Sequence, residues 1–229
     1  MPRKGVESML DNIIPILPDL WLAIGQTFLM LGIGVSAAIV LGGPLGVLLF
    51  LMSPGQSLSS PKIYLVVSWV VNTIRSFPFI ILLVVLAPFT LKIVGEPIGP
   101  LAASVPLSVA AIPYLARLVE QSLREVPRGV IEAAQAMGAS ELQIVWRVLA
   151  REARSGLILA LTVLAVSFLS YSAVAGVVGG GGIGDLAIRY GYYRFQTDVM
   201  LLTVAILIVI VQIIQFGGNA LAHRLDKRS

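Results

Sequence analysis

The chain alternates between long apolar stretches and short charged segments. The first apolar stretch, residues 20–61, contains no charged side chain at all. Because a helix needs about 20 residues to cross the hydrocarbon core, and because charges inside it are costly, such stretches mark membrane spans. The pattern predicts an all-α integral membrane protein with five transmembrane helices, at about 22–51, 64–90, 97–116, 156–178 and 199–219.

The first predicted span is longer than one crossing requires. A Gly42-Gly43-Pro44 cluster interrupts it, but no polar turn separates two halves, so one long or kinked helix is favoured over two helices. No internal repeat or low-complexity linker divides the chain. We therefore expect residues 1–229 to form a single transmembrane domain.

Composition supports a membrane location and argues against disulfides, metal sites and catalytic residues. Hydrophobic residues make up 57% of the 229 residues and charged residues only 12%, whereas a soluble domain is about 25% charged. The chain has no cysteine and one histidine, His223, so neither a disulfide framework nor a zinc or haem site is expected. The spans also lack paired carboxylates, so we expect no catalytic residues, no metal and no cofactor.

The basic residues are unevenly distributed between the two predicted sides of the membrane. If the C-terminus is cytoplasmic, the inside segments are 52–62, 117–154 and 223–229, and they hold ten of the 16 lysines and arginines. The outside segments hold five, and Arg75 remains near the membrane. Because cytoplasmic segments are enriched in Lys and Arg, we predict an outside N-terminus and a cytoplasmic C-terminus.

The loop 117–154 differs from everything around it, with six arginines and five glutamates. Pro127 suits a helix start and Gly138 a helix end, and Ser140 with Gln143 resembles a capping box that opens a second helix. Leu142, Val145, Leu149 and Ala153 would form the apolar face of that helix. A slim helix-turn-helix of this kind could fit a partner's groove, or lie on the membrane surface as an amphipathic loop. Its balanced charge and its position between spans argue against a DNA-reading role and against any nucleic acid partner.

Residues in this loop resemble the EAA motif of bacterial ABC importer permeases. Glu132-Ala133-Ala134 is followed at the family's spacing by Gly138 and later by Ile144, although Val148-Leu149-Ala150-Arg151 lacks the family's usual proline. Arg75-Ser76-Phe77-Pro78-Phe79 resembles a stretch of amino-acid importers. The run Gly179–Gly184 with Tyr190-Gly191-Tyr192 is similar to methionine importer permeases. The resemblance covers about residues 20–218.

The resemblance implies a multi-pass permease subunit of an ATP-driven importer that carries D- or L-methionine across the bacterial cytoplasmic membrane. It further implies a homodimer, two cytoplasmic ABC ATPase subunits and an extracytoplasmic methionine-binding protein. The loop 117–154 would be the coupling loop, and the expected ATPase-coupling residues are Glu132, Ala133, Ala134, Met137, Gly138 and Ile144. Glu132 could instead be a favourable charge near a helix N-terminus.

Two further features have a functional and a structural interpretation. Ser170, Tyr171 and Val174 in the fourth span could line the transport pathway or its gate, or could serve ordinary helix packing. Arg75 is an intramembrane charge and so a functional candidate. With Ser76 and Pro78 beside it, an interfacial position is favoured.

Several rival functions remain to be weighed. Gly179, Gly181 and Gly184 match the spacing of a dinucleotide fingerprint, but they end a membrane span and no strand-turn-helix unit surrounds them. No phosphate-binding P-loop occurs, so we expect a separate subunit to hydrolyse ATP. An ion-coupled secondary transporter fits poorly, because such carriers usually need mid-membrane ionisable groups. An ABC permease for another amino acid or small compound stays open.

Overall fold

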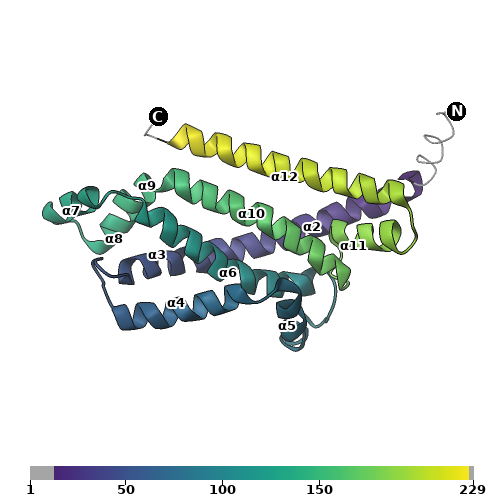
Figure 1. Ribbon diagram of the computed structural model, residues 1–229, viewed down its shortest axis with the longest axis horizontal. Coiled ribbons are helices and arrows are strands. Elements are labelled where there is room, and N and C mark those ends of the chain that lie inside the picture. The colour runs from purple at the N-terminus through teal and green to yellow at the C-terminus, as the bar shows by residue number, and fades with distance from the viewer. Residues whose placement is uncertain (1–12, 227–229) are drawn as a thin grey trace. The chain divides into compact units, whose positions relative to one another are not determined.

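The computed structural model describes residues 13–226, and its regular elements within that range are all helical (Figure 1). The long helices are α2 (Leu17–Ala37), α3 (Gly43–Met52), α4 (Pro61–Ser76), α5 (Phe79–Val94), α6 (Pro100–Arg124), α10 (Arg154–Val177) and α12 (Thr197–Leu225). The short ones are η1 (Ile14–Ile16), η2 (Ala38–Gly42), α7 (Arg128–Ala136), α8 (Glu141–Gln143), η3 (Ile144–Leu149), α9 (Ala150–Glu152), α11 (Gly182–Leu186) and η4 (Ala187–Tyr192). Four basic residues used to predict the orientation lie outside the described range, namely Arg3, Lys4, Lys227 and Arg228.

Between residues 13 and 226, four helical segments are long and apolar enough to cross a membrane, namely Ile14–Met52, Pro100–Arg124, Arg154–Val177 and Thr197–Leu225. A fifth span results if α4 and α5, which a short break separates, count as one. The predicted all-α membrane architecture is thereby confirmed. The first segment runs without a break through the Gly42-Gly43-Pro44 cluster, because the chain forms a π-helical turn, η2, just before α3.

The second predicted span, about 64–90, is not one helix. The chain leaves the α conformation at Phe77 (φ −69°, ψ 129°) and re-enters it at Phe79. Pro78 explains the break, because proline disfavours the α conformation in the residue before it and lacks a backbone N–H. Pro88, by contrast, lies inside α5, which ends at Gly95 with a left-handed φ of 85°.

The third predicted span, about 97–116, also ends later than expected. Helix α6 continues to Arg124, so Arg117, Glu120 and Arg124 belong to its last turns and not to a loop. Both arginines pair with Glu120, at spacings of three and four residues. Such pairs stabilise a helix. They allow the charged residues 117–124 to continue the apolar helix that precedes them.

The helices contribute to two compact units of interleaved chain segments. The first contains the described residues up to Gly34 together with Pro78–Ser108 and Val166–Ile213. The second contains Val35–Phe77, Val109–Ala165 and the described residues from Ile214 onward. Neither unit is a continuous piece of chain, so no single boundary divides the sequence.

In the first unit, α2 packs against α11 and the start of α12. Leu20 and Ala23 form a buried cluster with residues such as Ile183 and Val199. Side chains of α2 also cap α11: the Gly182 N–H donates to Gln26 Oε1 at 2.8 Å and the Ile183 N–H to Thr27 Oγ1 at 2.9 Å. These bonds satisfy backbone donors that a helix start leaves unpaired.

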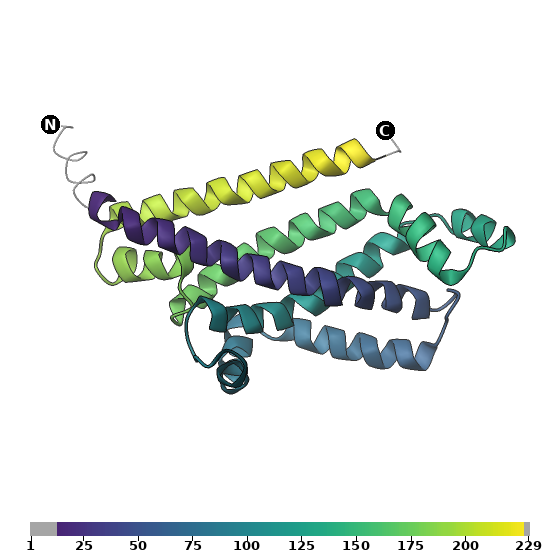
Figure 2. The ribbon, with the colours of Figure 1, turned by 180° about the vertical axis from the view of Figure 1, so that it is seen from behind.

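In the second unit, α3 and α4 lie side by side and are joined by residues 53–60 (Figures 1 and 2). Leu49, Val71 and Ala116 form the buried centre of this three-helix contact with α6. Gly42 permits the close approach, since a Cβ there would lie 2.4 Å from the carbonyl oxygen of Ile112. Small residues at such crossings let membrane helices pack closely.

Candidate functional site

The loop after α6 forms the predicted helix-turn-helix. Helix α7 ends at Ala136, and Gly138 then adopts a left-handed φ of 76° that glycine tolerates best. Ser140 caps the next helix, because its hydroxyl accepts from the Gln143 N–H and its own N–H donates to Gln143 Oε1 at 2.9 Å. The expected glycine stop and capping box are both present.

The second helix buries a different face from the one the sequence suggests. Ile144, Leu149 and Ala153 are buried, whereas Leu142 is 70% exposed. The cause is η3, a π-helical turn over Ile144–Leu149. Because a π turn pairs residues five apart, Ile144 and Leu149 share the buried side, and the ordinary helical spacing used for the prediction is wrong here.

The turn region exposes large apolar side chains. Met137 is 81% exposed, Leu142 70% and Trp146 69%, and we call these three residues the apolar patch. Leu142 and Trp146 are four residues apart. Exposed aromatic and methionine side chains of this size are typical of surfaces that bind another protein.

The six predicted coupling residues fall into two groups. Ala134 and Ile144 are buried and hold α7 against η3, whereas Glu132, Ala133, Met137 and Gly138 are exposed. Sequence reasoning missed Leu142 and Trp146 as surface residues. The one sequence feature that could have revealed them is the five-residue spacing of Ile144 and Leu149. This spacing fits a π turn, and a π turn leaves Leu142 and Trp146 on the exposed side.

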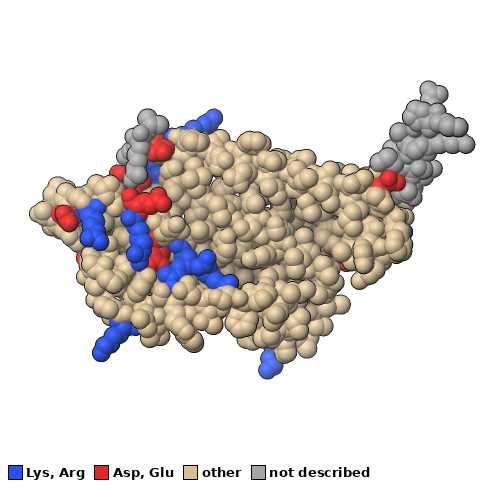
Figure 3. All heavy atoms as spheres, in the orientation of Figure 1, with Lys and Arg blue, Asp and Glu red and all other residues tan. Residues whose placement is uncertain are grey.

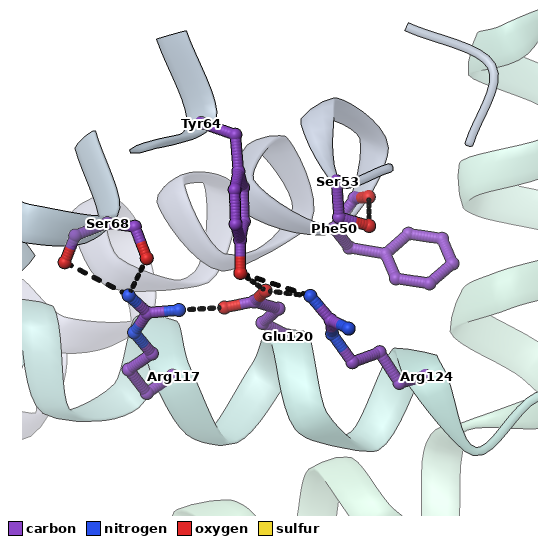
Figure 4. A network of polar contacts seen from close by, with 7 residues as sticks. All are labelled: Phe50, Ser53, Tyr64, Ser68, Arg117, Glu120 and Arg124. Atoms are coloured by element: carbon purple, nitrogen blue, oxygen red, sulfur yellow. Dashed lines mark hydrogen bonds and ion pairs between the residues drawn. The ribbon is translucent and has the colours of Figure 1, made fainter. Parts of the chain in front are cut away.

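A buried carboxylate fastens α4 to α6 (Figure 4). Glu120, with 3% of its side chain exposed, pairs with Arg117 at 2.6 Å and with Arg124 at 2.7 Å. The Tyr64 hydroxyl donates to the same carboxylate at 3.0 Å. Arg117 reaches back to α4, where it donates to the Ser68 carbonyl oxygen at 3.0 Å and to the Ser68 hydroxyl.

An open groove of about 420 Å³ runs beside this network. Its lining includes Tyr64, Arg75, Arg117, Glu120 and Arg124. Figure 3 shows that the charged side chains on the visible face gather over the end of α6 and over α7–α9. The guanidinium group of Arg75 lies 5.6 Å from the centre of the Tyr114 ring.

The predicted pathway residues lie near the end of α10 and have different surroundings. Ser170 is exposed, and Tyr171 and Val174 are half-buried. The Tyr171 ring stacks on Phe79 of α5 with centroids 4.9 Å apart, and meets Phe168 edge-on at 5.0 Å. Tyr171 is therefore held by aromatic contacts, while the side chain of Ser170 is exposed next to it.

A polar hollow of about 290 Å³ adjoins the glycine-rich turn, with Asp19, Asp185 and Arg189 in its lining. Tyr190 donates to Asp19 Oδ2 at 2.6 Å, and this hydrogen bond to a carboxylate raises the pKa of Tyr190. A raised pKa means that the bond stabilises the fold fully below the ordinary tyrosine pKa of about 10, and that this contribution is lost as pH rises through the higher folded value. Among residues 13–226, no group of three His, Cys, Asp or Glu side chains could hold a metal ion.

Similar proteins are found along nearly the whole chain. A family model described as "Binding-protein-dependent transport system inner membrane component" matches residues 34–229. The "Probable D-methionine transport system permease protein MetI" of Vibrio cholerae serotype O1 is 48% identical over 203 residues, 89% of this chain and 90% of the relative. The "Methionine import system permease protein MetP" of Bacillus subtilis (strain 168) is 42% identical over 212 residues, 93% and 96% of the two chains.

Solved structures give the same picture. A chain of the MetNI methionine ABC transporter in an inward-facing conformation superposes with a TM-score of 0.91 at 43% identity, and the match covers 93% of this chain and 99% of that one. A chain of an amino acid ABC transporter reaches a TM-score of 0.72 at 23% identity over 95% and 97%. The second likeness is one of fold alone.

Replacing the buried carboxylate should destabilise the helical unit that contains it. We expect Glu120→Gln to lower the free energy of unfolding by about 3 kcal/mol, because removing one partner of a buried ion pair leaves the other charge uncompensated. Thermal unfolding of the purified protein in detergent measures the change. The matched control, Asp185→Asn, breaks the half-exposed pair with Arg189 and should cost roughly 0–1 kcal/mol; equal losses would contradict the assignment.

Proposed function

Because the chain belongs to the family of binding-protein-dependent transport system inner membrane components, we propose that this multi-pass membrane protein is the permease subunit of an ATP-driven methionine importer. The observation that carries the proposal is the similarity to a chain of the MetNI methionine ABC transporter, at 43% identity and a TM-score of 0.91 over 93% of the sequence. Relatives of similar length named for methionine import support the same cargo.

The proposed assembly contains two copies of this permease, two cytoplasmic ABC ATPase subunits and an extracytoplasmic methionine-binding protein. ATP hydrolysis belongs to the separate ATPase subunits, since the sequence carries no phosphate-binding P-loop. In this assembly, residues 1–229 act as a single permease domain embedded in the lipid of the cytoplasmic membrane. Its N-terminus lies outside and its C-terminus in the cytoplasm, which agrees with the excess of basic residues in the predicted cytoplasmic segments.

The helix-turn-helix is the proposed contact with the ATPase. Its turn is slim because Ala133 and Gly138 present little side chain at the surface, and the apolar patch offers Met137 and Trp146 for burial. A short helix that inserts apolar side chains into a groove is a recurring mode of protein recognition. Glu132 is exposed next to this surface, where it can pair with a basic group of the partner.

Transport follows from movement at this contact. When ATP binding closes the two ATPase subunits, the helix-turn-helix moves with them and the permease helices rotate as rigid bodies between outward-open and inward-open states. Ser170, Tyr171 and Val174 line the pathway in this proposal, with Tyr171 in the gate. An aromatic ring held by Phe79 and Phe168 has few conformations, which suits a gate that must close completely.

The first experiment reconstitutes the permease with its ATPase and binding protein in proteoliposomes. The wild-type protein should take up methionine only with ATP. The double variant Met137→Ser/Trp146→Ser should bind the ATPase at least about tenfold more weakly, because aromatic anchors in an interface typically contribute about 2 kcal/mol or more, and uptake should fall with it. Phe195→Ser is the matched control, since Phe195 is 87% exposed but lies outside the loop.

Three other outcomes of this experiment would redirect the proposal. Uptake that needs no ATPase would identify a secondary transporter. ATP hydrolysis without methionine uptake would keep the family and assign a different cargo. An unchanged affinity for the ATPase in the double variant would remove the apolar patch from the contact.

Truncation of the proposed gate should open a leak. Vesicles loaded with methionine and supplied with no ATP should lose it several times faster with Tyr171→Ala than with the wild-type protein, because the ring no longer fills the passage. Tyr171→Phe keeps the stacking on Phe79 and should remain tight. A correctly assembled Tyr171→Ala transporter that does not leak would leave Tyr171 with a packing role only.

The orientation can be tested cleanly because the chain has no cysteine. A membrane-impermeant maleimide added to intact cells should label Phe195→Cys, and should label Ser140→Cys only after the cells are opened. Both side chains are exposed, so access depends on the side of the membrane. The reverse labelling pattern would overturn the proposed topology.

A further inference from the structure

The groove beside α4 and α6 holds more positive than negative charge. Arg75, Arg117 and Arg124 line it against one carboxylate, that of Glu120. Both oxygens of this carboxylate are already engaged, one by Tyr64 and Arg124 and the other by Arg117. Within residues 13–226, Arg75 forms no ion pair, and its recorded contact is the ring of Tyr114.

The groove also has unused hydrogen-bonding capacity. The Nε atom of Arg117 is buried without a hydrogen-bond partner, and the exposed guanidinium group of Arg75 has all its donors available to the groove. Guanidinium groups bind carboxylates and phosphates through paired hydrogen bonds. The hollow of about 420 Å³ is of the size that small-molecule sites have, so an oxyanion is the ligand chemistry that this surplus charge selects.

The two ends of the groove lie at different positions along α4 and α6. Helices α4 and α6 run antiparallel, because Tyr64 meets Arg124, Ser68 meets Arg117, and Arg75 meets Tyr114. At 1.5 Å per residue, Tyr114 lies about 15 Å along α6 from Arg124 and about 21 Å from Pro100. Arg75 therefore lies beside the middle of α6, a helix long and apolar enough to cross a membrane, while Arg124 lies at its end. Charges at mid-span face a water-filled cavity or a substrate path and not lipid.

We propose that this groove is an oxyanion site in the transport pathway, in which Arg75 binds the α-carboxylate of the amino acid in transit. The inference rests on the proposed import function and adds the chemical group recognised and the residue that recognises it. A lipid phosphate has the same chemistry, but a headgroup lies at the membrane interface, about half a hydrocarbon thickness from mid-span. The position of Arg75 favours the cargo. Glu120 has a positioning role, because it holds Arg117 and Arg124 at the groove wall.

The test measures methionine uptake per ATP hydrolysed by the complete transporter in proteoliposomes. Arg75→Gln should lower this ratio by about tenfold or more, because a hydrogen-bonded charge is lost, while the complex still assembles and hydrolyses ATP. Arg75→Lys keeps the charge without the paired geometry and should retain an intermediate ratio. Lys92→Gln removes an exposed positive charge at the end of α5 and should behave as wild type.

A second arm distinguishes the two sources of an oxyanion. Vesicles of digalactosyldiacylglycerol, a lipid without phosphate, are compared with vesicles that also contain phosphatidylglycerol. The cargo site requires the same Arg75→Gln defect in both membranes. If wild-type uptake falls to the Arg75→Gln level in the phosphate-free membrane, the ligand is a lipid phosphate and the inference is overturned.

The remaining outcomes are also decisive. An Arg75→Gln transporter that matches wild type overturns the inference and leaves the import function standing. Loss of ATP hydrolysis or assembly in both Arg75 variants would show a structural residue and also overturns it. If the wild-type complex itself shows no ATP-dependent methionine uptake, the proposed function is wrong, independently of Arg75.

Discussion

The ion-pair network of Glu120 is the interaction on which the unit of α3, α4 and α6 depends. A buried charge is tolerated only where it is paired and hydrogen-bonded, and here Arg117, Arg124 and Tyr64 supply the partners. The network joins α4 to the last turns of α6, and α6 leads directly to the helix-turn-helix. The end of α6, from which that element starts, is thus held by charged and polar contacts in addition to buried apolar side chains such as Leu123 and Val126.

Much of the fold could be predicted from the sequence, because charge in a membrane span is so costly that its absence reveals the span. Two predicted spans had wrong boundaries. The break at Phe77 could have been predicted from Pro78, but the continuous apolar pattern on both sides of it favoured one helix. The continuation of α6 past residue 116 had a weaker signal in the helical spacing of Arg117, Glu120 and Arg124. Their charge favoured a loop, and only the structure shows that Ser68 and Tyr64 of α4 supply hydrogen-bond partners.

The candidate site was predictable as a motif but not as a surface. The sequence located the turn through Gly138 and the capping box through Ser140, because both follow local backbone chemistry. It could not separate Ala134 and Ile144, which are buried, from Met137, which is exposed, since that division depends on how α7 packs against η3. The charged groove is a tertiary feature. Arg75 looked interfacial from its neighbours in sequence, and only its pairing with Tyr114 relates it to the middle of α6.

The π turn at Ile144–Leu149 makes this segment tolerant of a change in chain length. A π turn accommodates one residue more than an α turn. Losing a single residue there would restore regular α geometry, in which the side chains of Ile144 and Leu149 would be four residues apart and would still share one side of the helix. This stretch can therefore lose one residue without exchanging its buried face for its exposed face.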